Sequence, residues 1–215
     1  MRLRPSGDRA VLVELADADE RRRLDVVLRA APLPGVLEHV PAARTILVTV
    51  ADPARLPGLV AALRSLVLPG PGGDVAAADG AAADFADAEV LEIAVTYDGD
   101  DLPEVAAHLG CDVREVVARH TGQMWRVEFA GFAPGFGYLL GDRGGLEVPR
   151  RATPRTRIPP GAVGLAGPYS GVYPQASPGG WQLVGRTDLE MWDARRDPPA
   201  VLEPGRQVRF REVGR

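Results

Sequence analysis

The sequence predicts an α+β N-terminal domain followed by a mainly β domain, and three observations indicate this division. Residues 1–68 alternate between apolar runs of strand length and segments with apolar residues at helical spacing. Residues 69–88 contain no basic residue and few large apolar ones, which is typical of an interdomain linker. Beyond residue 122, short β-type runs are closely punctuated by glycine and proline. We therefore expect one domain over residues 1–80 and a second over residues 81–215.

The N-terminal elements are predicted in the order strand, helix, strand, strand, helix. In sequence order they are residues 10–15, 17–31, 36–40, 45–50 and 53–67. The first helix begins with acidic residues and carries Leu24, Val27 and Leu28 at helical spacing, whereas the strands are short β-branched or apolar runs. This order favours a small sheet with both helices on one side. One further strand, which the sequence does not place, would complete a ferredoxin-like unit.

The second domain is expected to begin with a strand at 89–97, followed by short helices at 101–109 and 113–121. The remaining predicted strands are at 125–129, 163–166, 181–184 and 208–210. Such short strands separated by glycine and proline favour a compact β-barrel or sandwich over a parallel α/β sheet.

Composition excludes several classes of chemistry. All 25 basic residues are arginine, so a lysine-dependent phosphate loop or a Schiff base within this chain is excluded. A net charge of −4 gives no global attraction to nucleic acid or an anionic membrane, and no apolar run is long enough to span a bilayer. Cys111 is the single cysteine and no two histidines have metal-ligand spacing, so neither a disulfide nor a metal site is expected. With no signal peptide at the start, we expect a cytoplasmic protein.

A glycine-rich aromatic loop at 131–138 is the first candidate binding element. Its glycine spacing and its context do not match a dinucleotide fingerprint. Phe132 and Phe136 can line a small-molecule pocket, although aromatic residues belong more often to the core.

An arginine-rich segment at 149–161 is the second candidate. Arg150, Arg151, Arg155 and Arg157 lie in a chain that prolines hold extended, so 151, 155 and 157 are expected on one face and 150 on the other. Guanidinium groups bind carboxylate or phosphate through paired hydrogen bonds. The segment is either a site for a small anionic substrate or a solvated basic loop; nucleic acid is disfavoured by the acidic remainder of the chain.

Two further positions carry candidate polar groups. His120 ends a predicted helix just before the glycine loop, where the helix dipole alone also stabilises a histidine. The run at 177–187 begins with a Gly-Gly turn and feeds a predicted strand in which Gln182, Val184 and Arg186 share one face. An amide and a guanidinium on one sheet face can bind a polar ligand through directed hydrogen bonds.

Taken together, these segments resemble one family. The runs GFAPGFGYL, PR-x-x-TPRTR-x-P-x-GAVGLAG and SGVYP-x-x-SPGGWQLVGRT are similar to the family of 5-oxoprolinase B subunits, also known as the allophanate hydrolase subunit 1 or KipI family. The N-terminal RLRPSGDRAVLVEL and the later VTYDGDDLPEVA extend the resemblance over nearly the whole chain. It departs from the family pattern at residues 168–171 and at Gly137.

The resemblance implies a ferredoxin-like N-terminal domain and a cyclophilin-like C-terminal barrel. It also implies one component of a hydrolase, inactive alone, that works with the 5-oxoprolinase C and A subunits to convert 5-oxoproline (pyroglutamate) to glutamate with ATP hydrolysis. Whether this chain itself binds ATP is left open. Two alternatives are an inhibitor of a sporulation-type histidine kinase and a component of a biotin-dependent urea carboxylase or allophanate hydrolase system.

By motif position, the resemblance also nominates the residues of the pocket. His120, Arg155 and Gln182 are the catalytic candidates, and Phe136, Arg150 and Arg186 are the substrate-binding candidates. In this hypothesis Arg150 and Arg155 hold a carboxylate or phosphate, Gln182 orients the ligand, and His120 is a general acid or base near neutral pH.

Overall fold

The computed structural model describes residues 1–70 and 90–214, and the chain divides into two compact units, Met1–Asp87 and Ala88–Arg215. The domain boundary predicted at residue 80 and most of the predicted linker at 69–88 lie outside the described residues. Among the described residues, no helix is both long enough and apolar enough to cross a membrane.

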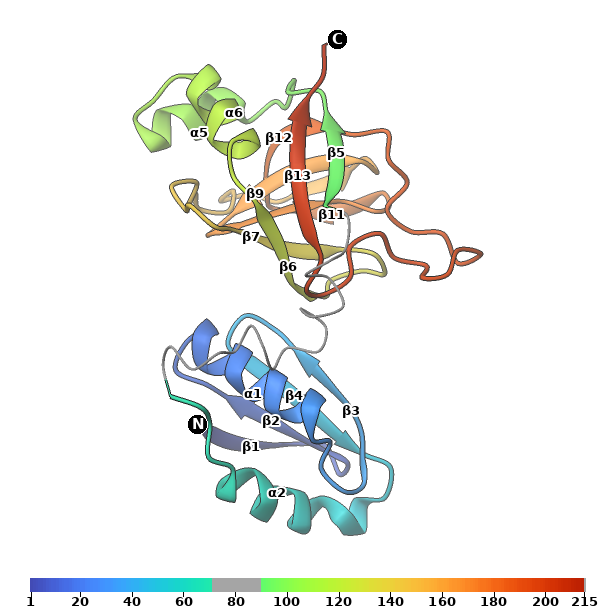
Figure 1. Cartoon of the computed structure of the whole chain (residues 1–215). Coiled ribbons are helices and arrows are strands. Elements are labelled where there is room, and N and C mark those ends of the chain that lie inside the picture. The colour runs from blue at the N-terminus through green and yellow to red at the C-terminus, as the bar shows by residue number, and fades with distance from the viewer. Residues whose placement is uncertain (71–89, 215) are drawn as a thin grey trace. The chain divides into compact units, whose positions relative to one another are not determined.

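The first unit is an antiparallel sheet covered by two helices (Figure 1). Its strands are β1 (Arg2–Ser6), β2 (Ala10–Glu14), β3 (Val36–Pro41) and β4 (Thr45–Val50), and its helices are α1 (Ala18–Ala30) and α2 (Leu56–Ser65), the latter preceded by the short 3-10 helix η1 (Pro53–Arg55). The sheet order is β1-β2-β4-β3. This is the spatial order of a ferredoxin-like unit, with its outer strand supplied by β1 from the N-terminus. The strand that the sequence analysis did not place is therefore β1.

Local sequence explains these elements. Asp17 caps α1, because its carboxylate accepts a hydrogen bond of 2.7 Å from the Glu20 backbone N–H. Alternate residues of β2 and β4 face both helices and form one apolar core with them. The fully buried members of this core include Val13, Leu24, Ile46, Val48, Val50 and Leu63.

The second unit is a seven-stranded sheet that curves into a nearly closed barrel (Figure 1). Its strands, in sheet order, are β12 (Gln182–Arg186), β9 (Ala162–Ala166), β10 (Tyr169–Val172), β7 (Gly137–Gly141), β6 (Trp125–Ala130), β13 (Gln207–Glu212) and β5 (Leu91–Val95). A bridge between Thr96 and Arg186 joins the two outer strands. A separate two-stranded ribbon consists of β8 (Arg155–Ile158) and β11 (Ser177–Gly179). The helices α5 (Leu102–Leu109) and α6 (Val113–Thr121) pack together near one end of the barrel.

The two faces of this sheet carry separate clusters of apolar residues. Along β9, Val163 and Leu165 belong to the inner core, whereas Ala162 and Ala166 belong to a second cluster. Because successive residues of a strand point to opposite faces, the two clusters lie on opposite sides of the sheet. The inner cluster includes the buried residues of α5 and α6, and the outer one is rich in aromatic rings. The predicted mainly β barrel is thus confirmed.

Candidate functional site

Four aromatic rings form the centre of the outer face. The ring of Phe136 lies 5.2 Å from Tyr138, 5.3 Å from Tyr173 and 5.2 Å from Trp181, between ring centroids, with each pair edge to face. Gly171 makes this cluster possible, because a Cβ at that position would lie 2.9 Å from the Phe136 ring and 3.1 Å from the Trp181 ring. Phe136 is buried, and its ring contacts that of the half-buried Tyr138.

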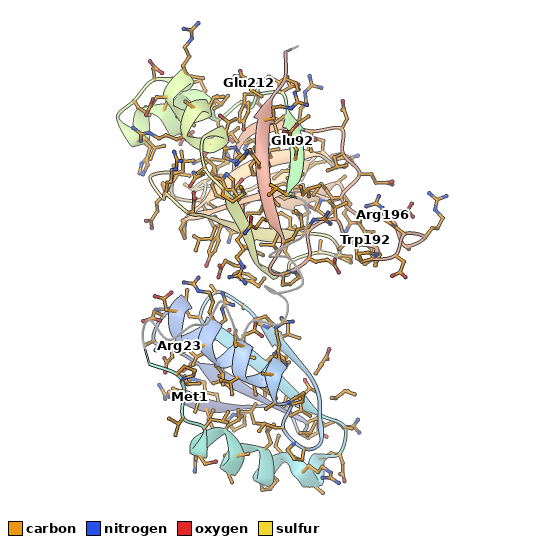
Figure 2. The ribbon with its side chains drawn as sticks, viewed as in Figure 1. Met1, Arg23, Glu92, Trp192, Arg196 and Glu212 are labelled. Atoms are coloured by element: carbon orange, nitrogen blue, oxygen red, sulfur yellow. The ribbon has the colours of Figure 1, made fainter. Side chains whose placement is uncertain are left out.

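The loop between β6 and β7 adds a strained, exposed ring to this face. Phe132 has a φ of 69° and is 57% exposed, although its ring still contacts Phe136 at 5.3 Å. A bulky residue in the left-handed region is unfavourable, and such strain is often found at binding sites. Gly135 of this loop lies against Trp192, which Figure 2 shows beside Arg196 on the long connection after β12. The loop is therefore packed against Trp192 at Gly135, while Phe132 is exposed to solvent.

Arg150 supplies a positive charge to the same face. Burial raises the pKa of Tyr173 to about 12, and both a hydrogen bond from the Trp181 backbone N–H and the charge of Arg150 oppose that rise. Burial likewise raises the pKa of Tyr138, again opposed by Arg150. Arg150 is exposed, and within residues 1–70 and 90–214 no carboxylate forms an ion pair with it. A guanidinium beside aromatic rings and phenol hydroxyls can bind a carboxylate or phosphate.

A buried carboxylate holds the segment that carries Arg150. Asp101, only 3% exposed, accepts hydrogen bonds from Arg155 at 2.8 and 2.9 Å, from Arg151 at 2.5 Å and from the Leu183 backbone N–H at 2.7 Å. Burial alone would raise the pKa of Asp101, but these hydrogen bonds and positive charges outweigh it and hold the pKa below its usual value. We call Asp101, Arg151 and Arg155 the arginine clamp. Because Asp101 occupies both terminal nitrogens of Arg155, that side chain is committed to the clamp.

Gln182 faces the inner side of the sheet and is 3% exposed. It pairs across the sheet with Leu165, a residue of the inner core. Its Nε2 donates to the Pro149 carbonyl oxygen at 3.3 Å, and its Oε1 is buried without a hydrogen-bond partner among the described residues. Gln182 therefore holds Pro149, the residue immediately before Arg150, through a hydrogen bond to its carbonyl oxygen.

His120 is fully buried at the centre of the inner core. Its Nδ1 lies 2.6 Å from the Tyr97 hydroxyl and its Nε2 lies 2.8 Å from the Ser170 hydroxyl, while its ring packs 4.4 Å from that of Phe210. Burial lowers the pKa of His120 to about 3. This shift favours the neutral imidazole at pH 7, and the role of His120 as a general acid or base stays a prediction.

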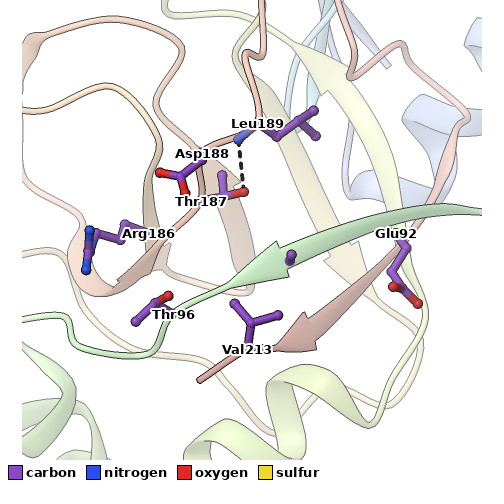
Figure 3. A pocket seen from close by; sticks show the side chains of 8 residues that line it. Glu92, Thr96, Arg186, Thr187, Asp188, Leu189 and Val213 are labelled. Atoms are coloured by element: carbon purple, nitrogen blue, oxygen red, sulfur yellow. Dashed lines mark hydrogen bonds between the residues drawn. The ribbon is translucent and has the colours of Figure 1, made fainter. Parts of the chain in front are cut away.

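Arg186 does not share a face with Gln182, and the expectation that it does is wrong. Gln182 pairs with Leu165 whereas Arg186 pairs with Ala162, because a β-bulge between Leu183 and Gly185 shifts the register. Leu165 and Ala162 are three residues apart on β9, so their side chains point to opposite faces. Arg186 forms an ion pair with Asp98 at 3.0 Å and lines a separate cavity of about 310 Å³ (Figure 3).

The structure thus brings Phe136 and Arg150 together on the outer face. Gln182 and His120 face the inner core, Arg186 lines a separate cavity, and Arg155, whose charge also reaches Tyr173, is held by Asp101. Tyr138 belongs to the predicted aromatic loop, but sequence reasoning did not nominate Tyr173, although it stands in a run that carries the family resemblance. It also missed Asp101, because nothing in the sequence links that residue to arginines that follow it by 50 and 54 positions.

Comparison with known proteins decides the family. The family model described as carboxyltransferase domain, subdomain C and D, matches residues 1–202. The 5-oxoprolinase B subunit of Escherichia coli O157:H7 is 38% identical over 211 residues, which cover 95% of this chain and 92% of that protein. The chain belongs to the family of 5-oxoprolinase B subunits.

Solved structures of related proteins agree with this membership. The structure of TTHA0988 is 35% identical in sequence to this chain and matches 96% of it with a TM-score of 0.72. This chain covers only 40% of TTHA0988. The urea carboxylase of Kluyveromyces lactis has a TM-score of 0.71 over 99% of the chain, of which this chain covers 22%; at 20% identity it shows the shared fold alone.

Proposed function

We propose that this chain is the B subunit of an ATP-dependent 5-oxoprolinase, which works with the C and A subunits to convert 5-oxoproline into glutamate. The observation that carries the proposal is the similarity to the Escherichia coli protein over nearly the full length of both chains. The outer face supports it, because an exposed arginine beside aromatic rings suits a small ring that bears a carboxylate.

The chemical features of 5-oxoproline suit the groups on this face. Its carboxylate would bind the Arg150 guanidinium through paired hydrogen bonds. Its flat five-membered ring would pack between the exposed Phe132 and the half-buried Tyr138. The Tyr138 hydroxyl, whose pKa burial raises above its usual value, would donate a hydrogen bond to the lactam oxygen. In this assignment the chain orients the substrate.

ATP makes the opening of a stable amide feasible. Transfer of the γ-phosphoryl group to the lactam oxygen would make the ring carbon more electrophilic. Water would then attack that carbon, and the ring C–N bond would break with protonation of nitrogen to leave γ-glutamyl phosphate. A second water molecule would hydrolyse this acyl phosphate to glutamate and phosphate. The products are glutamate, ADP and phosphate, with two water molecules consumed. Arg150 would hold the carboxylate still through these steps, which favours a reactive geometry.

The ATP site itself belongs, in this proposal, to another protein of the complex. Helix N-termini commonly bind phosphate, but Asp17, Asp101 and Asp112 are the N-caps of α1, α5 and α6. The start of α2 follows directly on η1, whose own N-cap is Asp52. A carboxylate at such a terminus repels phosphate. The absence of lysine also removes the usual partner of the transferred phosphoryl group in a phosphate loop.

We further propose that the remaining candidates position other parts of the domain. Arg155, within the arginine clamp, and Gln182, through the Pro149 carbonyl, would fix the backbone on either side of Arg150. His120 would hold Ser170 on β10, and Arg186 would hold the loop at Asp98. These are positioning roles, since His120 and Gln182 face the inner core and aspartates hold Arg155 and Arg186.

The direct test measures ATP-dependent release of glutamate from 5-oxoproline by the purified chain together with the A and C subunits of the same organism. We expect activity only when all three proteins are present. Omission of this chain should abolish turnover, and adding it back should restore it. Full turnover by the A and C subunits alone would contradict the proposal.

A carboxyltransferase role is a second candidate, because the matching family model is described as a carboxyltransferase domain. It would require a biotin carrier on another chain, since this one has no lysine to carry biotin. Transfer of labelled carboxylate from carboxybiotin to urea by the three-protein complex would favour this candidate. We expect no such transfer.

A further inference from the structure

The barrel of the second unit has a gap along one seam. Its two outer strands, β5 and β12, are joined where Thr96 and Arg186 exchange two backbone hydrogen bonds of 2.9 Å. Beyond Arg186 the chain turns away, because the Thr187 backbone N–H donates to the Gly161 carbonyl at 2.9 Å. Between β5 and residues 187–189 the cavity of about 310 Å³ lies open (Figure 3). We call this cavity the barrel seam.

The backbone of β5 presents hydrogen-bonding groups to the barrel seam. On its other side β5 pairs in parallel with β13, and the Val95 carbonyl accepts from the Val213 N–H at 2.9 Å. Thr96 instead directs both of its backbone groups toward Arg186. Since backbone groups alternate in direction along a strand that pairs in parallel, Glu92 and Ala94 direct theirs to the same side as Thr96. Both residues line the cavity.

The walls of the barrel seam also carry a charge and an apolar surface. Arg186 is bound to Asp98, and Arg211 is bound to Glu92 at 2.5 Å, so both nearby cations are neutralised. Asp188 lines the seam and is exposed, and over residues 1–70 and 90–214 no arginine pairs with it. Leu189 is 37% exposed beside it. The barrel seam therefore offers a free strand edge, one unpaired carboxylate and an apolar side chain.

We propose that the barrel seam binds an extended segment of the partner C subunit, which adds a strand beside β5 and places a basic side chain at Asp188. This inference rests on the proposed function for the identity of the partner. An extended peptide supplies the alternating N–H and C=O groups that a strand edge binds. Charge complementarity requires the basic side chain. A large partner is also expected, since this chain corresponds to only 40% of the related TTHA0988.

Residue-resolved hydrogen–deuterium exchange of the chain alone and with the C subunit tests the proposal. We expect the amides of Glu92 and Ala94 to become protected in the complex, whereas those of Ile93 and Val95, which face β13, are protected already. A complex in which Glu92 and Ala94 stay unprotected would overturn this inference and leave the proposed function standing. Failure of the two proteins to bind would overturn both. Protection in the chain alone that rises with its concentration would show that a second copy occupies the barrel seam, and would also overturn it.

Two matched variants locate the contact. Ala94→Pro removes the N–H that faces the barrel seam without removing a hydrogen bond to β13, so affinity for the C subunit should fall about tenfold. Ala94→Gly is the control, because glycine also weakens a strand but retains the N–H. Asp188→Asn should weaken binding and reduce its dependence on salt. Equal affinities for the proline and glycine variants, with both folded by circular dichroism, would overturn the proposal.

Discussion

The two faces of the seven-stranded sheet use polar groups in opposite ways. On the inner face His120 is fully buried, and both of its ring nitrogens have hydroxyl partners. On the outer face Arg150 is exposed beside tyrosine rings and has no ion-pair partner among the described residues. Polar groups that the fold itself satisfies stabilise the fold, whereas those it leaves open at the surface remain available to a ligand. The inner face is therefore a stabilising network and the outer face a candidate binding surface.

The arginine clamp gives the same contrast within one segment. Arg150 and Arg155 stand five positions apart, and both match the family pattern. Asp101 neutralises Arg155 and leaves Arg150 alone. Within this motif Arg151 and Arg155 hold the segment in place, whereas Arg150 is exposed to solvent.

Removal of the clamp carboxylate should have the largest effect on stability. Asp101→Asn leaves two half-buried guanidinium groups without their buried counter-charge, and we expect the free energy of unfolding to fall by about 3 kcal/mol. Urea denaturation measures this change. The neighbouring Asp100→Asn is the control, because Asp100 is largely exposed and lies 3.8 Å from Arg155; it should cost less than about 0.5 kcal/mol. Equal losses in the two variants would contradict the clamp.

The buried histidine should make stability depend on pH. The unfolded chain takes up a proton on His120 near pH 6.5, whereas the folded chain does not until about pH 3. Protons therefore favour the unfolded state between these values, and stability falls as the pH is lowered through this window. From pH 7 to pH 5 this one group should account for a loss of about 2 kcal/mol.

A variant in which His120 is replaced by a residue that does not titrate isolates the contribution of His120 to the pH dependence. His120→Gln should be less stable than the wild type at pH 7, because Tyr97 and Ser170 lose their partner. Between pH 7 and pH 5 its stability should fall by about 2 kcal/mol less than that of the wild type. The exposed His108→Gln is the matched control, because it leaves His120 and both of its hydroxyl partners in place. An unchanged slope in His120→Gln would show that the pKa of His120 does not differ between the folded and unfolded states, which would contradict the account.

The smallest effect is expected at the surface ion pair of Arg186. Its side chain is 59% exposed, so the pair with Asp98 is well solvated. Arg186→Gln should lower the free energy of unfolding by about 0.5 kcal/mol or less, as measured by thermal or urea denaturation. A loss as large as that of Asp101→Asn would show that Arg186 is essential to closure of the barrel.

Most helices and long strands could be predicted from the sequence, because each carries a strong local signal. Asp17 and Asp112 cap helices where the pattern places their start, and β4 alternates between buried and half-buried residues. The strands β7, β8, β10 and β11 were not predicted, because they are short and rich in glycine, proline or charge. Their extended form depends on neighbours that are distant in the sequence.

The candidate site was only partly predictable, for two physical reasons. The bulge at Leu183–Gly185 reverses the face of every later side chain on β12, and a period-two pattern does not reveal it. The burial of His120 depends on Trp125, Ser170 and Phe210, which come from three different strands. Phe136 and Arg150 remain predicted members of the site, and the motifs that carry them are local in the sequence.

The kinetics of the complete three-protein enzyme with Arg150→Gln and Arg157→Gln test the central claim most directly. Both arginines are exposed in the same segment, but only Arg150 stands beside the aromatic face. We predict that Arg150→Gln lowers kcat/KM for ATP-dependent glutamate release by about 30-fold, which corresponds to about 2 kcal/mol, whereas Arg157→Gln leaves it within about twofold. Equal kcat/KM values for the two variants would contradict the assignment of the outer face as the substrate site.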